Sequence, residues 1–117
     1  MDITCFDDLL AAARAQPLPQ RLLLVFAAGH GGELAPSMCV DKSPDEIASF
    51  DALAAESRRA GPPWAVVFAA CLEGTAGAPL DSRAAEEPLR RMVERVRSGA
   101  LGGMAAFDTS GHAVTLR

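Results

Sequence analysis

The stretch LLLVFAAGHGGELAP, residues 22–36, joins an apolar run to a glycine cluster. Residues 22–28 are apolar at successive positions, which is typical of a strand covered on both faces. A dinucleotide-binding loop would need a third glycine where Leu34 stands and a helix after it, and a P-loop would need G-K-[ST]. Because residues 35–42 have the composition of another strand, we interpret residues 29–32 as a hairpin turn.

The clearest helix signal lies in residues 43–60. Ser43 stands at the N-cap position, Pro44 at the first helical position, and Glu46 completes a capping box. Gly61, followed by two prolines, ends the segment. The predicted buried stripe consists of Ile47, Phe50, Leu53 and Ala54.

Two further segments, residues 4–16 and 82–98, have apolar residues at helical spacing. Pro88 would clash with the carbonyl four residues earlier, so the regular helix either starts near Glu87 or bends there. The apolar stripe of this last helix is Leu89, Met92, Val93 and Val96.

The remaining segments have strand character. Residues 64–72 form a second apolar run, and residues 102–117 are typical of a final hairpin with its turn at residues 108–111. The predicted order is α-β-β-α-β-α-β-β in a single domain, residues 1–117. Its class is α/β (α+β), with three helices and a mixed sheet of four or five strands. Two strand–helix–strand connections imply parallel neighbours in this sheet.

Composition restricts the classes of partner. The chain has 117 residues, half of them hydrophobic, which is enough for one compact core. A net charge of −4 gives no electrostatic footprint for nucleic acid or an anionic membrane. The acidic N-terminus does not match a secretory signal, and three cysteines without a C-x-x-C pair suit a reducing compartment, so we expect a cytoplasmic protein.

Four charged residues follow predicted strands. Asp41 and Lys42 follow the second strand, Glu73 the third and Asp108 the fourth. If these strands are parallel, the four side chains end at one edge of the sheet, where the carboxylates could hold Mg²⁺ or a small ligand. The alternative interpretation is that polar residues ordinarily terminate strands.

Other groups of residues favour structural interpretations. Cys39 could pair with His30 or His112 as a nucleophile, but Cys39 and Cys71 lie in apolar strands and are expected in the core. Two histidines without neighbouring ligands do not make a zinc site. Trp64 is expected to be a core anchor rather than an interface anchor. The last helix carries arginines interleaved with acids, which predicts a solvated face: Arg90, Arg91, Arg95 and Arg97 with Glu86, Glu87 and Glu94.

Four stretches resemble a family of small proteobacterial proteins of unassigned function: FDDLLAAARAQPLPQRLLLVFA, LAPSMCVDKSPDEIASF, GPPWAVVFAACLEG and EEPLRRMVERVRSG. The resemblance covers nearly the whole chain, although the family has a longer segment where this chain has GHGGE. Its members often carry the label "ribonucleotide reductase subunit alpha". A catalytic reductase subunit is a barrel of several hundred residues with a radical-bearing cysteine, so the resemblance transfers no catalytic residue. The element pattern is also similar to the SseB-type N-terminal domain, as a likeness of fold alone.

These observations favour a non-enzymatic cytoplasmic protein that acts through protein–protein contacts, with a second copy of the chain, in a homodimer, among the expected partners. No catalytic, cofactor-binding or metal-binding residue is predicted, and neither nucleic acid nor a membrane is an expected partner. One alternative is a small enzyme or ligand-binding domain that uses Asp41, Lys42, Glu73 and Asp108. A further alternative, which follows from the family label, is an accessory to a nucleotide-pathway enzyme.

Overall fold

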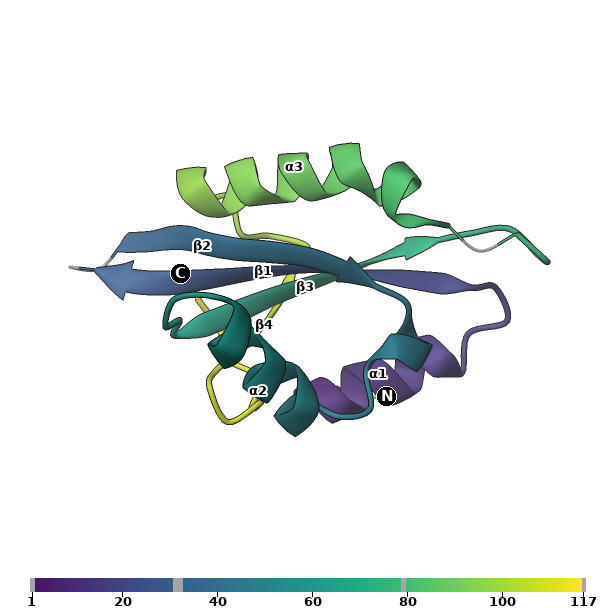
Figure 1. Cartoon of the computed structure of the whole chain (residues 1–117), viewed down its shortest axis with the longest axis horizontal. Helices are drawn as coiled ribbons and strands as arrows, with labels where there is room; N and C mark the ends of the chain where they lie inside the picture. The colour runs from purple at the N-terminus through teal and green to yellow at the C-terminus, as the bar shows by residue number, and fades with distance from the viewer. Residues whose placement is uncertain (1, 31–32, 79, 117) are drawn as a thin grey trace.

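The computed structural model describes residues 2–30, 33–78 and 80–116. Three α-helices pack against the two faces of a four-stranded sheet, with α3 on one face and α1 and α2 on the other (Figure 1). None of the helices in this part of the chain is long and apolar enough to cross a membrane. The elements are α1 (Phe6–Arg14), β1 (Gln20–His30), β2 (Glu33–Lys42), the short 3₁₀ helix η1 (Pro44–Glu46), α2 (Phe50–Ala60), β3 (Val66–Glu73), α3 (Ser82–Ser98) and β4 (Ala105–Phe107).

The sheet has the order β2-β1-β3-β4, and every pair of neighbours is antiparallel. β1 and β2 form the predicted hairpin, since His30 stands opposite Glu33. Gly31 and Gly32, the middle of the predicted turn, lie outside the described residues. The element that follows the glycine cluster is the strand β2 and not a helix. The cluster therefore does not lead into a helix N-terminus that could face a phosphate.

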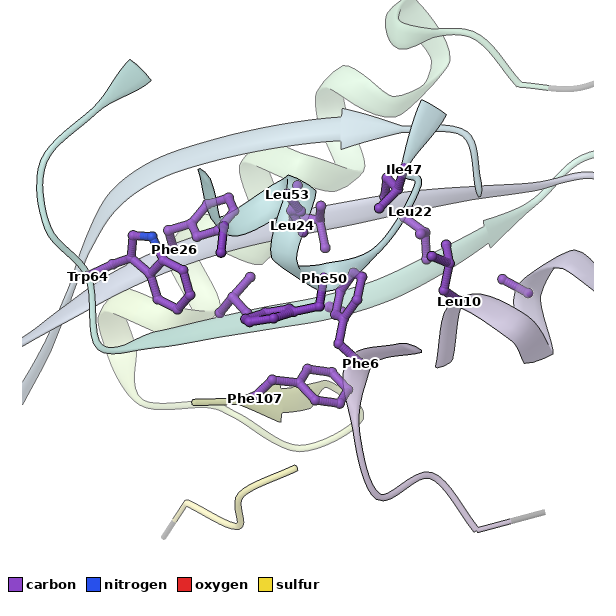
Figure 2. Packing of buried hydrophobic residues seen from close by; sticks show 14 residues of the cluster. Phe6, Leu10, Leu22, Leu24, Phe26, Ile47, Phe50, Leu53, Trp64 and Phe107 are labelled. Atoms are coloured by element: carbon purple, nitrogen blue, oxygen red, sulfur yellow. The ribbon is translucent and has the colours of Figure 1, made fainter. Parts of the chain in front are cut away.

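β1 is apolar at successive positions because both of its faces are covered. Leu22, Leu24 and Phe26 face α1 and α2, while the residues between them face α3. On the first face, the rings of Phe6 and Phe107 pack edge to face with their centroids 5.4 Å apart (Figure 2). The α3 face is lined by Leu23, Val25, Ala27, Val66, Phe68, Ala85, Leu89, Met92, Val96 and Ala106.

Trp64 belongs to the core, as predicted. Its ring centroid lies 5.1 Å from that of Phe26, and only 8% of the residue is exposed. The indole N–H donates to the Ser57 hydroxyl, which in turn donates to the Ala54 carbonyl. The polar end of this large ring is therefore satisfied inside the core.

The prediction of parallel neighbours was wrong. β2 and β3 do run in the same direction, since both are antiparallel to β1, but β1 lies between them. β3 and β4 are neighbours, yet they pair antiparallel even though α3 connects them. In the first case the connection through α2 passes over β1, so β2 and β3 run in the same direction without being neighbours.

The helix predicted over residues 43–60 is divided in two. The capping box is present, with the Ser43 N–H donating to Glu46 Oε1 at 2.9 Å, but it begins only a 3₁₀ turn. α2 starts at Phe50 because Ser49 provides a second cap, accepting from the Ala52 N–H. The Phe50 N–H also donates to Asp7 of α1, a contact between segments far apart in the sequence.

α3 spans Ser82–Ser98, as the helical spacing predicted, and contains Pro88, so of the two alternatives a start near Glu87 is excluded. The Asp81 carboxylate accepts from the Ala84 N–H at 2.9 Å and caps the first turn. The cap and the buried Ala85 hold a turn that Pro88 alone would disfavour.

The β4 side of the sheet is closed by the terminal segments. The predicted turn after β4 is confirmed by the bond from the Gly111 N–H to the Asp108 carbonyl, but the second arm contains only isolated bridges. The Ala113 N–H then donates to the Thr4 carbonyl at 2.9 Å, and the Phe6 N–H donates to the Gly111 carbonyl. The ladder is thus extended beyond β4 first by the C-terminal segment and then by the residues that precede α1.

Candidate functional site

The four charged residues expected at one edge are not brought together. Asp41 and Glu73 lie at the same end of the sheet, but they point to opposite faces, because Asp41 bonds to Arg21 and Glu73 to Gln20. Asp108 lies at the other end, since it follows Phe107, the partner of Val67 at the start of β3. Lys42 forms an ion pair with Glu56 of α2, with 3.0 Å between Nζ and Oε1.

Asp41 holds the start of α3 against the sheet. Its Oδ2 atom accepts from Arg21 of β1 and from the Ser82 hydroxyl, both at 2.7 Å, and its side chain is 16% exposed. Burial alone would raise the pKa of Asp41, but the hydrogen bonds from Ser82 and Arg21, with the Arg21 charge, lower it below its usual value. Through these contacts the Asp41 carboxylate links β2 to β1 and to the first residue of α3.

No metal site is formed in residues 2–30, 33–78 and 80–116, where no three His, Cys, Asp or Glu side chains come together as ligands. Asp108, for example, accepts from the Ser110 and His112 N–H groups and shapes the turn after β4. Each predicted acid in the described chain therefore has a structural partner.

The expectation that Cys39 and Cys71 are core residues was wrong, because both are exposed. Cys39 lies on the outermost strand, and Cys71 lies near the end of β3. Partial burial still raises the pKa of the Cys71 thiol, which disfavours the thiolate that a nucleophile needs. Cys39 and His112 lie at different sides of the sheet, so they do not form a pair; the His30 side chain lies outside the described residues.

The arginines of α3 lie on a solvated face of mixed charge, as predicted. Arg90 pairs with Glu87 at 2.7 Å and with Glu86 at 3.6 Å, and Arg97 pairs with Glu94. These side chains are more than half exposed, so the pairs add little stability. On this face, acidic side chains of the same helix therefore balance the charges of Arg90 and Arg97.

The most distinctive feature of the surface is the free edge of β2. β2 pairs with β1 on one side, and in the described chain no strand pairs with its other side (Figure 1). The backbone groups on that side are unpartnered and can bond to an added strand.

The hydrogen bonds of β1 identify which groups of β2 face outward. The Phe26 carbonyl lies on the β2 side, where it accepts from the Ser37 hydroxyl, whereas the Pro19 and Ala27 carbonyls lie on the β3 side. Because backbone groups alternate between neighbouring strands, even-numbered β1 residues bond toward β2. Their partners in the register up to the bulge are Met38, Val40 and Lys42, so the backbone groups of Cys39 and Asp41 point outward.

A β-bulge reverses this alternation in the middle of β2. The register shifts between Phe26 and Ala27, so Ala28 pairs with Ala35 and Ala27 with Pro36. Pro36 therefore points its nitrogen outward, where the missing N–H does not interrupt the ladder to β1. The outward-facing positions of β2 are Leu34, Pro36, Cys39 and Asp41.

A shallow apolar groove accompanies this edge on the α2 side. It has a volume of about 240 Å³, and Met38 and Val40 of β2 face Leu53 and Ala60 of α2 across it. The Lys42–Glu56 ion pair belongs to its lining. A strand added to β2 could place alternate side chains in this groove.

Sequence reasoning did not identify the β2 edge, although one signal was present. Pro36 interrupts a strand pattern, and proline within strands is confined mainly to edges and bulges. Residues 34–40 also carry no charge, whereas exposed edge strands often carry charges that prevent pairing.

Comparisons of the chain with known protein families, with curated proteins and with solved structures found no match.

Proposed function

We propose that this chain is a non-enzymatic, cytoplasmic binding module that holds an extended segment of a protein partner as an additional strand on β2. The observation that carries the proposal is the contrast between the two sides of the sheet. The β4 side is covered by the terminal segments, whereas β2 offers outward backbone groups beside an apolar groove. Backbone bonds would supply affinity and the groove would supply selectivity.

The environment of the charged residues supports binding rather than catalysis. Asp41, Lys42 and Asp108 each bond to a neighbouring element or turn. Free Cys39 and Cys71 on the surface suit a reducing compartment, because exposed thiols oxidise outside one.

The test is a quantitative affinity capture that compares edge variants of the tagged chain in cells that produce it naturally. Cys39→Pro removes an outward N–H without removing a bond to β1, and Pro36 shows that β2 accommodates a proline at such a position. Cys39→Ser is the matched control, since it changes the same side chain and keeps the N–H. We expect the wild-type chain and Cys39→Ser to retain the same partner, and Cys39→Pro to lose most of it.

Thermal unfolding of the three purified proteins verifies that Cys39→Pro remains folded. A partner that binds the folded Cys39→Pro chain as well as wild type would show that binding does not use the β2 edge. Failure of the wild-type chain to retain any protein, including another copy of itself, would overturn the proposed function.

A further inference from the structure

We infer that the segment that pairs with β2 is β2 of a second copy of this chain, so that two molecules form one continuous sheet around a two-fold axis. This inference rests on the proposed function and assigns its partner. In a two-fold pair the same surface is used twice, and antiparallel strands satisfy that condition. Three features of β2 support this partner.

The first feature is the symmetry of the outward-facing positions. In a register that places Leu34 opposite Asp41 of the second copy, Pro36 stands opposite Cys39 of the second copy. The Leu34–Asp41 pairs can then exchange two bonds each, whereas Pro36 has no N–H, so each Pro36–Cys39 pair contributes only the bond from the Cys39 N–H to the Pro36 carbonyl. The two-fold axis repeats both pairs. The bulge makes this match, because it moves the outward positions from even to odd numbers at the middle of the strand.

The second feature is charge. The same register places Glu33, which is exposed, opposite Lys42 of the second copy. Both side chains lie on the α2 face of the sheet, since Leu34, next to Glu33, packs on the α3 face and Lys42 stands opposite Leu22 of the α2 face. Glu33 would then join the existing Lys42–Glu56 pair, and parallel pairing of the strands would instead place like charges together.

The third feature is the apolar centre of the strand. Residues 34–40 carry no charge, so no repulsion opposes their approach to an identical strand. Ala35 would stand opposite Val40 of the second copy on the α2 face, where Val40 is only half-buried in the isolated chain. The pairing would thus cover the partly exposed Val40 with an apolar neighbour of the second copy.

Sedimentation of the purified full chain over a wide range of concentrations tests this partner. We expect the mass to rise from 12.2 kDa toward twice that value, with Cys39→Ser behaving as wild type. Cys39→Pro removes one hydrogen-bond donor from each copy. We therefore expect the dissociation constant of the dimer to rise by at least about tenfold. A folded wild-type chain that stays monomeric at every concentration overturns the inference.

Cross-linking tests the register. In a Cys5→Ser, Cys71→Ser background, Pro36→Cys places a thiol opposite Cys39 of the second copy, within reach of a disulfide. Mild oxidation should give a covalent dimer of this variant and little of the same background with Pro36 retained, because the two Cys39 residues do not face each other. Equal cross-linking of both proteins would contradict the register.

Charge reversal provides an independent test. Glu33→Lys replaces an attraction by a repulsion at each end of the paired strands, so we expect self-association to weaken by about threefold to tenfold. Glu33→Gln should have a smaller effect, and added salt should reduce the difference. A monomeric chain that still captures another protein through the β2 edge would overturn this inference while leaving the proposed function in place.

Discussion

The indole Nε1 of Trp64 donates to the hydroxyl oxygen of Ser57, a buried polar side chain of α2, at a distance of 2.8 Å. Ser57→Ala leaves this N–H without a partner inside the core. We expect the free energy of unfolding to fall by about 1–2 kcal/mol, measured by urea denaturation followed by circular dichroism. In a Trp64→Phe background there is no N–H to satisfy, so the same substitution should cost much less; an equal cost in both backgrounds would contradict this account.

Asp41 should make stability depend on pH in the acid range. Its pKa is lowered from 3.8 in the folded chain, so the folded state releases this proton more readily than the unfolded state does. The resulting stabilisation is present above pH 3.8 and is lost as the pH falls through the lower folded pKa.

Asp41→Asn should therefore reduce the free energy of unfolding by about 1–2 kcal/mol at neutral pH. The difference from wild type should shrink as acid protonates Asp41. The exposed Glu94→Gln variant is a control that should change stability by less than about 0.5 kcal/mol. A difference that stays constant down to the acid limit would show that the charge of Asp41 does not stabilise the fold.

Gly111 should tolerate no side chain. Its φ is +86°, and a Cβ atom would lie 2.8 Å from Cδ2 of Phe50, whose ring is held between Phe6 and Trp64. Gly103 has a similar φ of +82° and open space around it. We expect Gly103→Ala to cost about 1 kcal/mol and Gly111→Ala about 2–4 kcal/mol in chemical denaturation. Similar costs at both positions would mean that Phe50 can move aside.

Pro88→Ala should stabilise the chain. Pro88 has no N–H to donate to the Ala84 carbonyl one turn earlier, although both lie within α3. Restoring this bond should raise the free energy of unfolding by about 1–3 kcal/mol and the melting temperature by several degrees. Arg91→Ala on the solvated face serves as a control with little expected effect. An unchanged melting temperature for Pro88→Ala would indicate that the local backbone already compensates for the proline.

Much of this fold could be predicted from local patterns. The apolar run at residues 22–28 predicted a strand with two covered faces, and β1 has them. The sequence pattern also predicted three helices, the hairpin of β1 and β2, the core position of Trp64 and the turn after β4. Each of these features leaves a pattern among residues that are close together in the sequence.

Several of the errors share one physical origin, because they depend on contacts between distant segments. α2 begins at Phe50 partly because Asp7 accepts its N–H, and no pattern within residues 43–60 reports that contact. The exposure of Cys39 depends on β2 being an outer strand, which follows from the position of β3 on the far side of β1. The candidate site was missed for the same reason, since an edge is a property of strand order and not of composition.

The closure of the β4 side has a consequence for synthesis of the chain on the ribosome. Phe6 and Thr4 bond to Gly111 and Ala113, so residues made early wait for partners about a hundred residues later in the chain. Until then the nascent sheet has two open sides, and α1 lacks the ladder that anchors its start. Such contacts between distant segments slow folding, and a ribosome that stalls before Gly111 would leave an aggregation-prone intermediate for chaperones to shield.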